Sequence, residues 1–565
     1  MSLFGTIQNA GNALIAAQLG LQVTGNNIAN ANTPGYIRQR LILTPAPIQH
    51  YGGLLLGTGV RVLAVKQEID KFLEERLRSA NSDLANGETQ EGVYLQLEGI
   101  LGALTDSDLS TSLTKFMASI NDVLNQPESA SIRNLAVLQG QQLAGDIGRL
   151  NQQARTLYGD INTQIDEQVA EINKRLAEVA DLNKKIVTAE GGDVSPSDAV
   201  GLRDRRNLVL SELSQIMDIR TAEQPAGDVA VYSGGDFLVF QGTYRPVYRD
   251  ATVEDGLTTT EVRISETDAP VGTAGGKLAG LIAARDQIVG GFLNELDDFA
   301  ATLIFEFNKL YSTGQGLIGF SSLTSEFAAD DPAAPLNQAG LDFAPVNGLF
   351  QVQVKNSLTG LTETTDVFID LDGLSGDTSL DDLVAALDAI DGISASLDSR
   401  GRLEINADAP NMTFSFAGDT SGTLAALGLN HFFSGTGAHD IGISQVLRAE
   451  PRLFAASLGG PAEDARNAER LADFLNRPLA TQDGLTLGQV YDQMASDITQ
   501  GAAATRAATE GFRTFQQTLE GQALSITGVN LDEEAVKMIT WQRSYQASAK
   551  IITTVNEMLE TLLNM

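Results

Sequence analysis

Cysteine is absent from this chain of 565 residues, and it has only three histidines and one tryptophan. Without cysteine, neither disulfides nor thiol chemistry is available. The absence suits a protein that is exported unfolded and refolds outside the cell, although many cytosolic proteins also have few cysteines. No uninterrupted apolar run approaches the ~18–20 residues that a membrane span needs. The sequence therefore excludes cysteine-based catalysis and predicts no membrane span.

Acidic residues are missing from the start of the chain, where the first one is Glu68. That stretch contains Arg38, Arg40, Arg61 and Lys66, whereas the whole chain has a net charge of −34. A protein so acidic repels nucleic-acid phosphates and anionic lipid, so we expect no nucleic-acid partner. The acid-free stretch has two interpretations. It is a packed helix with few solvated faces, or a mildly basic arm that meets acidic surface on neighbouring subunits.

Length and composition predict a folded protein of several domains. At 565 residues the chain is too long for one core, and 43% hydrophobic with 19% charged residues argues against wholesale disorder. The first twenty residues lack a basic n-region and a long apolar h-region, so we expect no secretory signal peptide. If the protein leaves the cell, it uses another route.

Both ends of the chain carry apolar side chains at alternating steps of four and three, which is the spacing of a narrow seam between packed helices. The N-terminal seam comprises Leu3, Ile7, Ala10, Leu14, Ala17 and Leu21. The C-terminal seam comprises Met538, Trp541, Tyr545, Ser548, Ile552, Val555, Leu559 and Leu562. We expect these two coiled-coil-like helices to pair with each other. The second begins at Asn530 as N-cap, with Glu533 closing a capping box.

A turn follows the first helix, which we expect to end near Asn30. Thr33 precedes proline and is restricted to extended geometry, and the pair Pro34-Gly35 favours a type II turn.

The middle of the chain predicts a long helical shaft between β-rich segments. Residues 131–189 keep one apolar seam, and a helix of that length would extend about 87 Å. The seam comprises Leu143, Ile147, Leu150, Ala154, Leu157, Ile161, Ile165, Val169, Ile172, Leu176, Val179 and Ile186. Residues 218–270 and about 345–433 instead show the alternation and turn residues of strands.

We therefore predict a multidomain α+β fold, with terminal coiled-coil-like helices, a long helical shaft and inserted β-rich modules. Four domains are expected. Residues 1–66 with 525–565 form a terminal helical core, residues 67–217 with 271–312 and 440–524 form the shaft domain, and residues 218–270 and 313–439 form two β-rich modules.

The histidines and clustered aspartates of this chain do not match a recognisable catalytic or metal-binding motif. His50, His431 and His439 lack the spacing of a zinc helix, and we expect structural roles for them. An acidic run that includes Asp370, Asp372 and Asp377 suggests calcium, but it lacks the EF-hand spacing and terminal Glu. Ser379 with Asp382 favours a capping box, so we interpret these acids as turn and cap residues. We expect no catalytic, cofactor or metal site, and no enzyme.

Two motifs at opposite ends resemble one known family. The segment NNIANANTPGY (26–36) resembles the N-terminal signature of the flagellar axial proteins of rod, hook and hook–filament junction, and WQRSYQASAKIITTVNEMLETLL (541–563) resembles their C-terminal signature. The resemblance extends to the long helix and to segments 201–219, 275–288 and 421–435, which are similar to hook-associated members. Its N-terminal turn residues are Asn27, Asn30, Asn32, Thr33, Pro34, Gly35 and Tyr36.

The resemblance implies a structural subunit, secreted by the flagellar type III apparatus, that forms the junction between hook and filament. Implied partners are copies of itself, the hook protein, the third hook-associated protein and an export chaperone that holds the C-terminal seam. Trp541 departs from the family, whose members often carry another residue there, and it should alter packing only locally. Alternatives remain a different secreted axial or coiled-coil filament subunit, a cytosolic tether, and a β-module that acts as an adhesin or hydrolase.

Overall fold

The computed structural model describes residues 3–51, 54–102, 109–191, 197–254, 256–272, 274–374 and 376–564. The chain divides into two compact units. The first comprises Met1–Val93, Gly159–Asp286 and Ala502–Met565, and the second comprises Tyr94–Tyr158 and Gln287–Gly501. Both contain helices and several small sheets, so the predicted multidomain α+β fold is confirmed.

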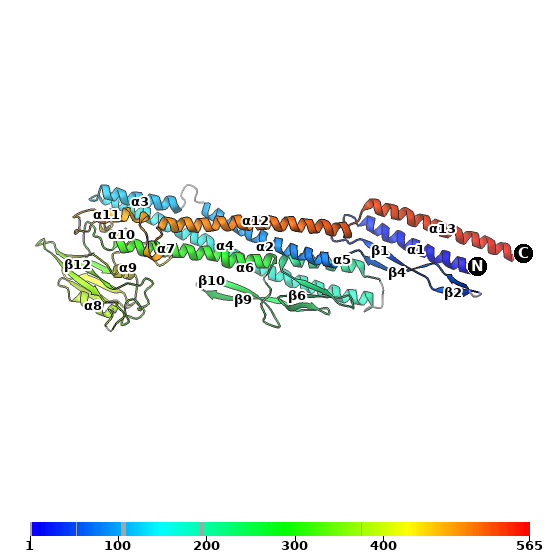
Figure 1. Ribbon diagram of the computed structural model, residues 1–565. Coiled ribbons are helices and arrows are strands. Elements are labelled where there is room, and N and C mark those ends of the chain that lie inside the picture. Colours follow the sequence, from blue (N-terminus) through cyan, green and yellow to red (C-terminus); the bar gives the residue numbers. More distant parts are fainter. Residues whose placement is uncertain are drawn as a thin grey trace. The chain divides into compact units, whose positions relative to one another are not determined.

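The first unit holds both ends of the chain (Figure 1). Helix α1 (Leu3–Ala29) packs against α13 (Leu531–Leu563), as predicted from their seams. Two antiparallel pairs of strands follow α1, namely β1 (Gln39–Pro45) with β4 (Val60–Gln67) and β2 (Ile48–Tyr51) with β3 (Leu54–Gly57). Strands β1 and β4 contact α1, so α1 packs against both α13 and this pair of strands.

The shaft helix α4 (Ala130–Glu190) confirms the long helix predicted for this region. Of its twelve predicted seam residues, eleven are buried and Val169 is half-buried. Three asparagines on α4 bind backbone groups of the neighbouring β-rich segment. Asn162 donates to the Thr258 carbonyl. The side-chain amides of Asn173 and Asn183 each form two hydrogen bonds with the backbone N–H and carbonyl of one strand residue, Val247 and Val229 respectively. The chain therefore covers both an apolar and a polar side of α4.

The same unit contains the β-rich segment and the helices that flank it. Its elements are α5 (Val200–Ile216), β5 (Arg220–Glu223), β6 (Val229–Ser233), β7 (Asp236–Phe240), β8 (Thr243–Tyr244), β9 (Val247–Glu254), β10 (Leu257–Ile264) and α6 (Gly276–Ala283). Strands β5 to β8 form one antiparallel sheet in chain order, and β9 with β10 forms a hairpin. Helices α2 (Lys71–Gly102) and α12 (Leu487–Thr527), like α4, have residues in both units.

The second unit is built around α7 (Gly290–Tyr311), which a π-helical turn (Ala284–Val289) precedes. Other α-helices that lie wholly within this unit are α3 (Leu109–Asn125), α8 (Leu380–Asp388), α9 (Thr423–Leu427), α10 (Gln445–Ala449) and α11 (Arg466–Ala472). Phe116, Phe307 and Phe432 form an aromatic core, with ring centroids 5.2–5.4 Å apart. Such pairs add to the stabilisation that burial of the rings provides.

The second unit also contains two three-stranded antiparallel sheets. One has the order β13 (Thr362–Ile369), β12 (Gly348–Asn356), β16 (Met412–Ala417), and the other β11 (Ser322–Thr324), β15 (Leu403–Ala407), β14 (Ile393–Leu397). A short antiparallel pair, β17 (Phe433–Ser434) with β18 (Gly442–Ile443), follows them in the chain. In β12 the buried residues alternate as the sequence predicts, at Phe350, Val352 and Val354.

Helix α3 was missed in the sequence. Its buried residues nevertheless recur at helical spacing, because Leu113, Phe116, Ile120 and Val123 share one face. Within the described residues, no helix combines the length and apolarity needed to span a bilayer.

Candidate assembly interface

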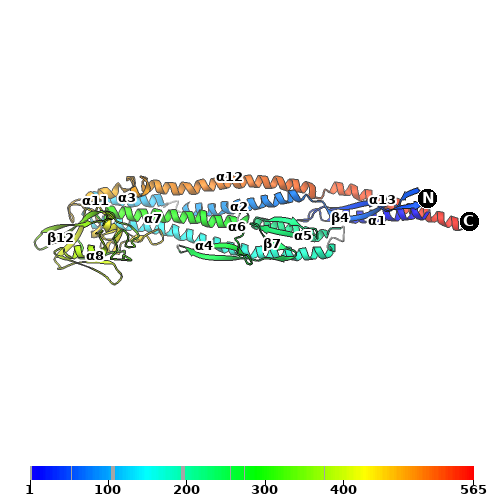
Figure 2. The same cartoon turned by 60° about the horizontal axis from the view of Figure 1, so that its bottom comes forward.

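The pair formed by α1 and α13 is the place where the two predicted seams meet. Glu534 lies against Asn27 and Trp541 lies against Gly20, so the chain advances seven residues along each helix in opposite directions. The helices are therefore antiparallel, and both termini lie at the same end of the pair (Figure 2). Continued to the C-terminus, this register places Leu562 beyond the first residue of α1.

Gly20 accommodates the indole of Trp541. A Cβ atom added at Gly20 would lie 2.4–2.9 Å from three atoms of the ring, which is closer than real side chains approach. Ala16, Ala17 and Thr24 on the same part of α1 are also buried. Small residues thus let the largest side chain of α13 sit directly against the α1 backbone, which is the local consequence of the tryptophan at position 541.

The structure places the predicted seam residues unequally. On α1, the seam residues Ala10 and Ala17 are buried, whereas Leu3, Ile7, Leu14 and Leu21 are half-buried. On α13, Val555 is buried, and Met538, Trp541, Ile552 and Leu559 are half-buried. Tyr545 and Leu562 are exposed, at 38% and 58%. The pairing brings together most of both seams but covers them incompletely.

The turn after α1 has the predicted geometry. Gly35 has a φ of +76°, and the Tyr36 N–H donates to the Thr33 carbonyl at 3.2 Å. Both features are those of a type II turn with Pro34 and Gly35 at its centre. Asn30 directly follows the last residue of α1, where its side-chain nitrogen donates to the Asn26 carbonyl and its side-chain oxygen accepts from the Thr33 hydroxyl. Asn32 is exposed.

Asn27 connects this turn to both α13 and β1. Its side-chain nitrogen donates to the Gln39 carbonyl and to Glu534 Oε2, each at 3.0 Å. Its side-chain oxygen accepts from the Tyr36 hydroxyl at 2.8 Å and from the Gln39 N–H at 3.0 Å. All four hydrogen-bonding positions of the amide are used, and its residue is 1% exposed. A buried amide so fully satisfied fixes one arrangement of helix, turn and strand.

Arg38 and Glu534 complete this buried network. Arg38 Nε and Nη2 donate to Glu534 Oε1 at 3.0 and 2.8 Å, and Nη2 also reaches Glu533 at 2.6 Å. Burial alone would raise the pKa of Glu534, but hydrogen bonds from Asn27, Lys537 and Arg38 outweigh it and lower that pKa. The carboxylate is therefore ionised and held by partners from both ends of the chain.

Asp204 on α5 supports the same turn with the opposite electrostatic outcome. Its carboxylate accepts from the Ile37 N–H at 3.3 Å and from the Gln67 side chain. Burial raises the pKa of Asp204 to about 6, against the lowering effect of these two bonds. Burial, together with Asp204 and Glu534, raises the pKa of Tyr36 to about 12, so the phenol keeps its proton for Asn27.

Sequence reasoning found Asn27 and Tyr36 only as members of a motif, and it did not identify their partners. Asn530 is the N-cap as predicted, but the Glu533 carboxylate binds Arg38 rather than closing the predicted capping box. The signal for this network was present in the sequence. Arg38 follows the turn in a stretch without acidic residues at one end of the chain, and three acids open the last helix at the other.

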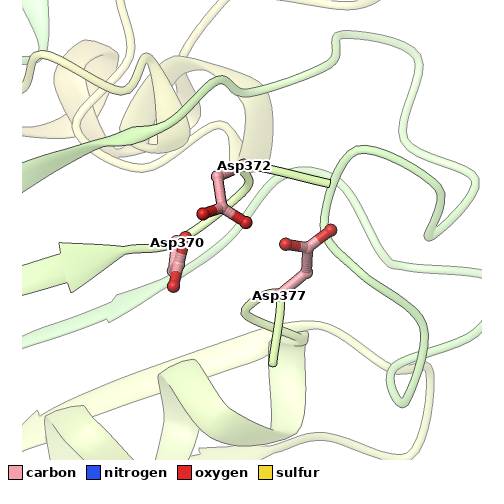
Figure 3. Close-up of side chains that lie close together, drawn as sticks. All are labelled: Asp370, Asp372 and Asp377. Carbon is pink, nitrogen blue, oxygen red and sulfur yellow. The ribbon is translucent and has the colours of Figure 1, made fainter. Parts of the chain in front are cut away.

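Three carboxylates lie close together between β13 and α8, at Asp370, Asp372 and Asp377 (Figure 3). Asp372 accepts from the Leu374 N–H at 2.9 Å and Asp377 from the Gly373 N–H at 3.2 Å. Ser379 and Asp382 form the predicted capping box of α8. Asp372 and Asp377 therefore stabilise a turn, as the sequence predicts, and exposed acids of this kind are common without a cation.

The three histidines differ in their surroundings. His431 is buried and its Nδ1 lies 2.5 Å from the Gly428 carbonyl oxygen, and burial lowers its pKa. His439 lies 3.7 Å from Asp440 and 3.9 Å from Asp297, and His50 is exposed on β2.

Three families of known proteins match segments of this chain. Residues 94–323 match the flagellar hook-associated protein FlgK helical domain. Residues 7–36 match the flagella basal body rod protein family, and residues 520–565 match the C-terminal family of flagellar basal body rod FlgEFG proteins. The two end motifs of the sequence fall inside these last two matches, so the resemblance to flagellar axial proteins is confirmed.

Curated relatives match over nearly the whole chain. Flagellar hook-associated protein 1 of Escherichia coli strain K12 is 26% identical over 99% of both chains, and that of Bacillus subtilis strain 168 is 25% identical over 100% of this chain and 98% of the relative. A solved structure, the flagellar hook junction protein FlgK from Burkholderia pseudomallei, matches with a TM-score of 0.49 and 15% identity over 80% of this chain and 100% of that one.

Proposed function

We infer that this chain is a structural subunit of the bacterial flagellum that forms the junction between hook and filament. The similarity to flagellar hook-associated protein 1 over 99% of the chain is the observation that carries this conclusion. Rod-family segments at both ends and a hook-associated helical domain between them agree with it. These relatives are structural proteins of the flagellum, and the chain serves the same kind of role.

We further propose that the protein reaches this position by type III export and that its partners are other copies, the hook protein and the third hook-associated protein. A dedicated chaperone would hold the C-terminal seam before export. The exposed apolar side chains of α13 support binding by a chaperone or another subunit, because they form a surface that such a partner can cover. The four-domain division, with a terminal core of 1–66 and 525–565, remains part of the same proposal.

In this proposal the seams Leu3, Ile7, Leu14, Leu21 and Met538, Trp541, Tyr545, Ile552, Val555, Leu559, Leu562 mediate assembly. Their incomplete cover within one chain supports the idea. Burial of an apolar side chain yields about 1.5–3 kcal/mol, so half-covered seams retain part of that free energy for association. The turn and the Asn27 network would hold the two seams in register.

A deletion strain tests the function. Cells that lack the protein should keep their hooks, lose their filaments and shed flagellin monomers into the culture supernatant. Filaments of normal length on such cells would contradict the proposal.

A double substitution tests the C-terminal seam. Leu559→Asp with Leu562→Asp should abolish junction assembly, because two charges would enter a surface that partners bury. The purified variant should keep the far-ultraviolet circular dichroism of the parent. A matched control, Glu557→Asp with Glu560→Asp, leaves the charge of the same turn unchanged and should assemble normally. Filaments on the Leu559/Leu562 variant would refute the role of this seam.

A further inference from the structure

A small cavity in the first unit is lined by charged side chains from several elements. It has a volume of about 110 Å³ and lies where α2, α5, β5 and β6 meet. Four cations line it, namely Lys71, Arg78, Arg203 and Arg206, together with three glutamates. A water molecule needs roughly 10–15 Å³ of such space, so the cavity is large enough for several waters or for one small polyatomic ligand.

Two of these cations share one glutamate of the cavity wall. Lys71 and Arg203 Nη1 bind the two carboxylate oxygens of Glu223. Arg203 also binds Glu190, through Nε at 2.7 Å and Nη2 at 2.8 Å. The protein itself therefore supplies carboxylate partners to both Lys71 and Arg203.

Arg78 faces the other two glutamates of the wall. Its Nη2 donates to Glu75 at 3.1 Å, and its Nη1 lies 4.0 Å from Glu74. Burial raises the pKa of Glu74, while the charge of Arg78 opposes that rise. A raised pKa brings the neutral form of this carboxyl, which does not repel an anion, within easier reach.

Arg206 differs from the other three cations, because it is only 2% exposed and forms no ion pair within the part of the chain that the structure describes. Its Nη1 donates to two neutral acceptors, the Asn183 side-chain oxygen at 3.0 Å and the Gly227 carbonyl at 2.7 Å, and its Nε has no partner. Burial, and then the charge of Arg203, lower the pKa of Arg206 to about 10, so the guanidinium is still charged at pH 7. Buried charges in proteins are normally paired, and this one lines a cavity with room for a counter-ion.

We propose that this cavity binds a small tetrahedral oxyanion, such as phosphate or sulfate, and that Arg206 is its principal partner. A guanidinium presents parallel N–H groups that match the oxygens of such an anion, and charge-assisted hydrogen bonds are stronger than neutral ones. The four cations outnumber the three carboxylates on the cavity wall, which favours a ligand of negative charge. A bound anion would join α2, α5 and the β-rich segment, and it would stabilise the first unit because it binds only the folded chain. The site does not depend on the proposed junction function.

Isothermal titration calorimetry of the purified full-length chain tests the site, with inorganic phosphate or sulfate as the probe. The protein is first dialysed against chloride, and the titrations are made at constant ionic strength so that screening does not change with the anion. We expect at least one of the two anions to bind once per chain at millimolar or lower concentration. The midpoint temperature of thermal unfolding should rise with the concentration of that anion. The inference is wrong if neither anion binds.

Two substitutions test whether the anion binds in this cavity. Arg206→Lys keeps the positive charge but removes the planar fork, and Lys71→Gln removes one cation of the wall whose side chain is largely exposed. Each should weaken binding by about tenfold, the effect of losing one charge-assisted hydrogen bond. Lys185→Gln is the matched control, since Lys185 is an exposed lysine on α4 that does not line the cavity, and this variant should bind as the parent does. If Arg206→Lys does not fold, Lys71→Gln decides. Folded variants at both positions that bind as tightly as the parent would overturn the assignment.

Discussion

Helices α4 and α13 carry the same apolar spacing, but the chain treats them differently. Ile147, Ile161 and Leu176 of the α4 seam are completely buried, whereas Tyr545 and Leu562 of the α13 seam are exposed at 38% and 58%. Helix α4 contacts α5 through the ion pair of Arg175 with Glu212, and it contacts the β-rich segment that its asparagines bind. Helix α13 packs on α1, and most of its residues remain exposed. A seam thus identifies a packing face, and the difference teaches that the partner for that face need not be in the same chain.

Truncating the buried seam should have the largest effect. Leu176→Ala removes a fully buried side chain, and we expect the free energy of unfolding to fall by about 2–5 kcal/mol. Urea titration followed by circular dichroism measures this loss. Leu562→Ala, the matched truncation on α13, should change the isolated protein by less than about 0.5 kcal/mol. Equal losses in the two variants would remove the distinction between the helices.

Filling the space under the indole should have a smaller effect that is confined to the terminal pair. Gly20→Ala places a methyl group against Trp541, and overpacking of this kind costs about 1–3 kcal/mol. Hydrogen exchange should speed up in α1 and α13 while α4 amides exchange as before. Adding Trp541→Leu should restore slow exchange, because the smaller side chain leaves room for the methyl group. Faster exchange throughout α4 would show that the two regions unfold as one.

Neutralising the buried carboxylate should cost a similar or smaller amount. Glu534→Gln removes the buried carboxylate among the partners of Arg38, and an unsatisfied buried polar group costs about 1–3 kcal/mol. Folding lowers the pKa of Glu534 below its ordinary value of 4.5. The stabilisation of the fold by this carboxylate is therefore present above pH 4.5 and is lost as the pH falls through the lowered pKa. Hydrogen exchange of α1 measured against pH should show this loss in the natural chain, and the Gln variant should lack it.

The smallest change is expected at the turn. Pro34→Ala frees the backbone at the first central position of the type II turn, and such substitutions cost about 0.4–1 kcal/mol. Exchange of the Tyr36 amide, which closes the turn, should quicken. Thermal melting of the rest of the protein should stay unchanged, and a sharp drop there would mean that the predicted domain boundaries are wrong.

The sequence by itself determined the helices at both ends, the long α4 helix, the type II turn and the α8 cap. Each depends on neighbours within a few residues, through helical period, proline geometry or a capping side chain. Helix α3 was missed, although its buried residues recur with the same helical period.

Only the tertiary structure decided which face of α1 meets α13. Periodicity placed Ala10 and Ala17 in the seam, and both are buried. It also favoured Leu3, Ile7, Leu14 and Leu21, which are only half-buried, whereas Gly20 is buried because it admits Trp541 from more than 500 positions away. The same holds for Asn27, Arg38 and Glu534, whose network joins the two ends of the chain. Spacing along a helix fixes which side chains share a face, whereas contact between distant segments depends on shape and charge that no local pattern encodes.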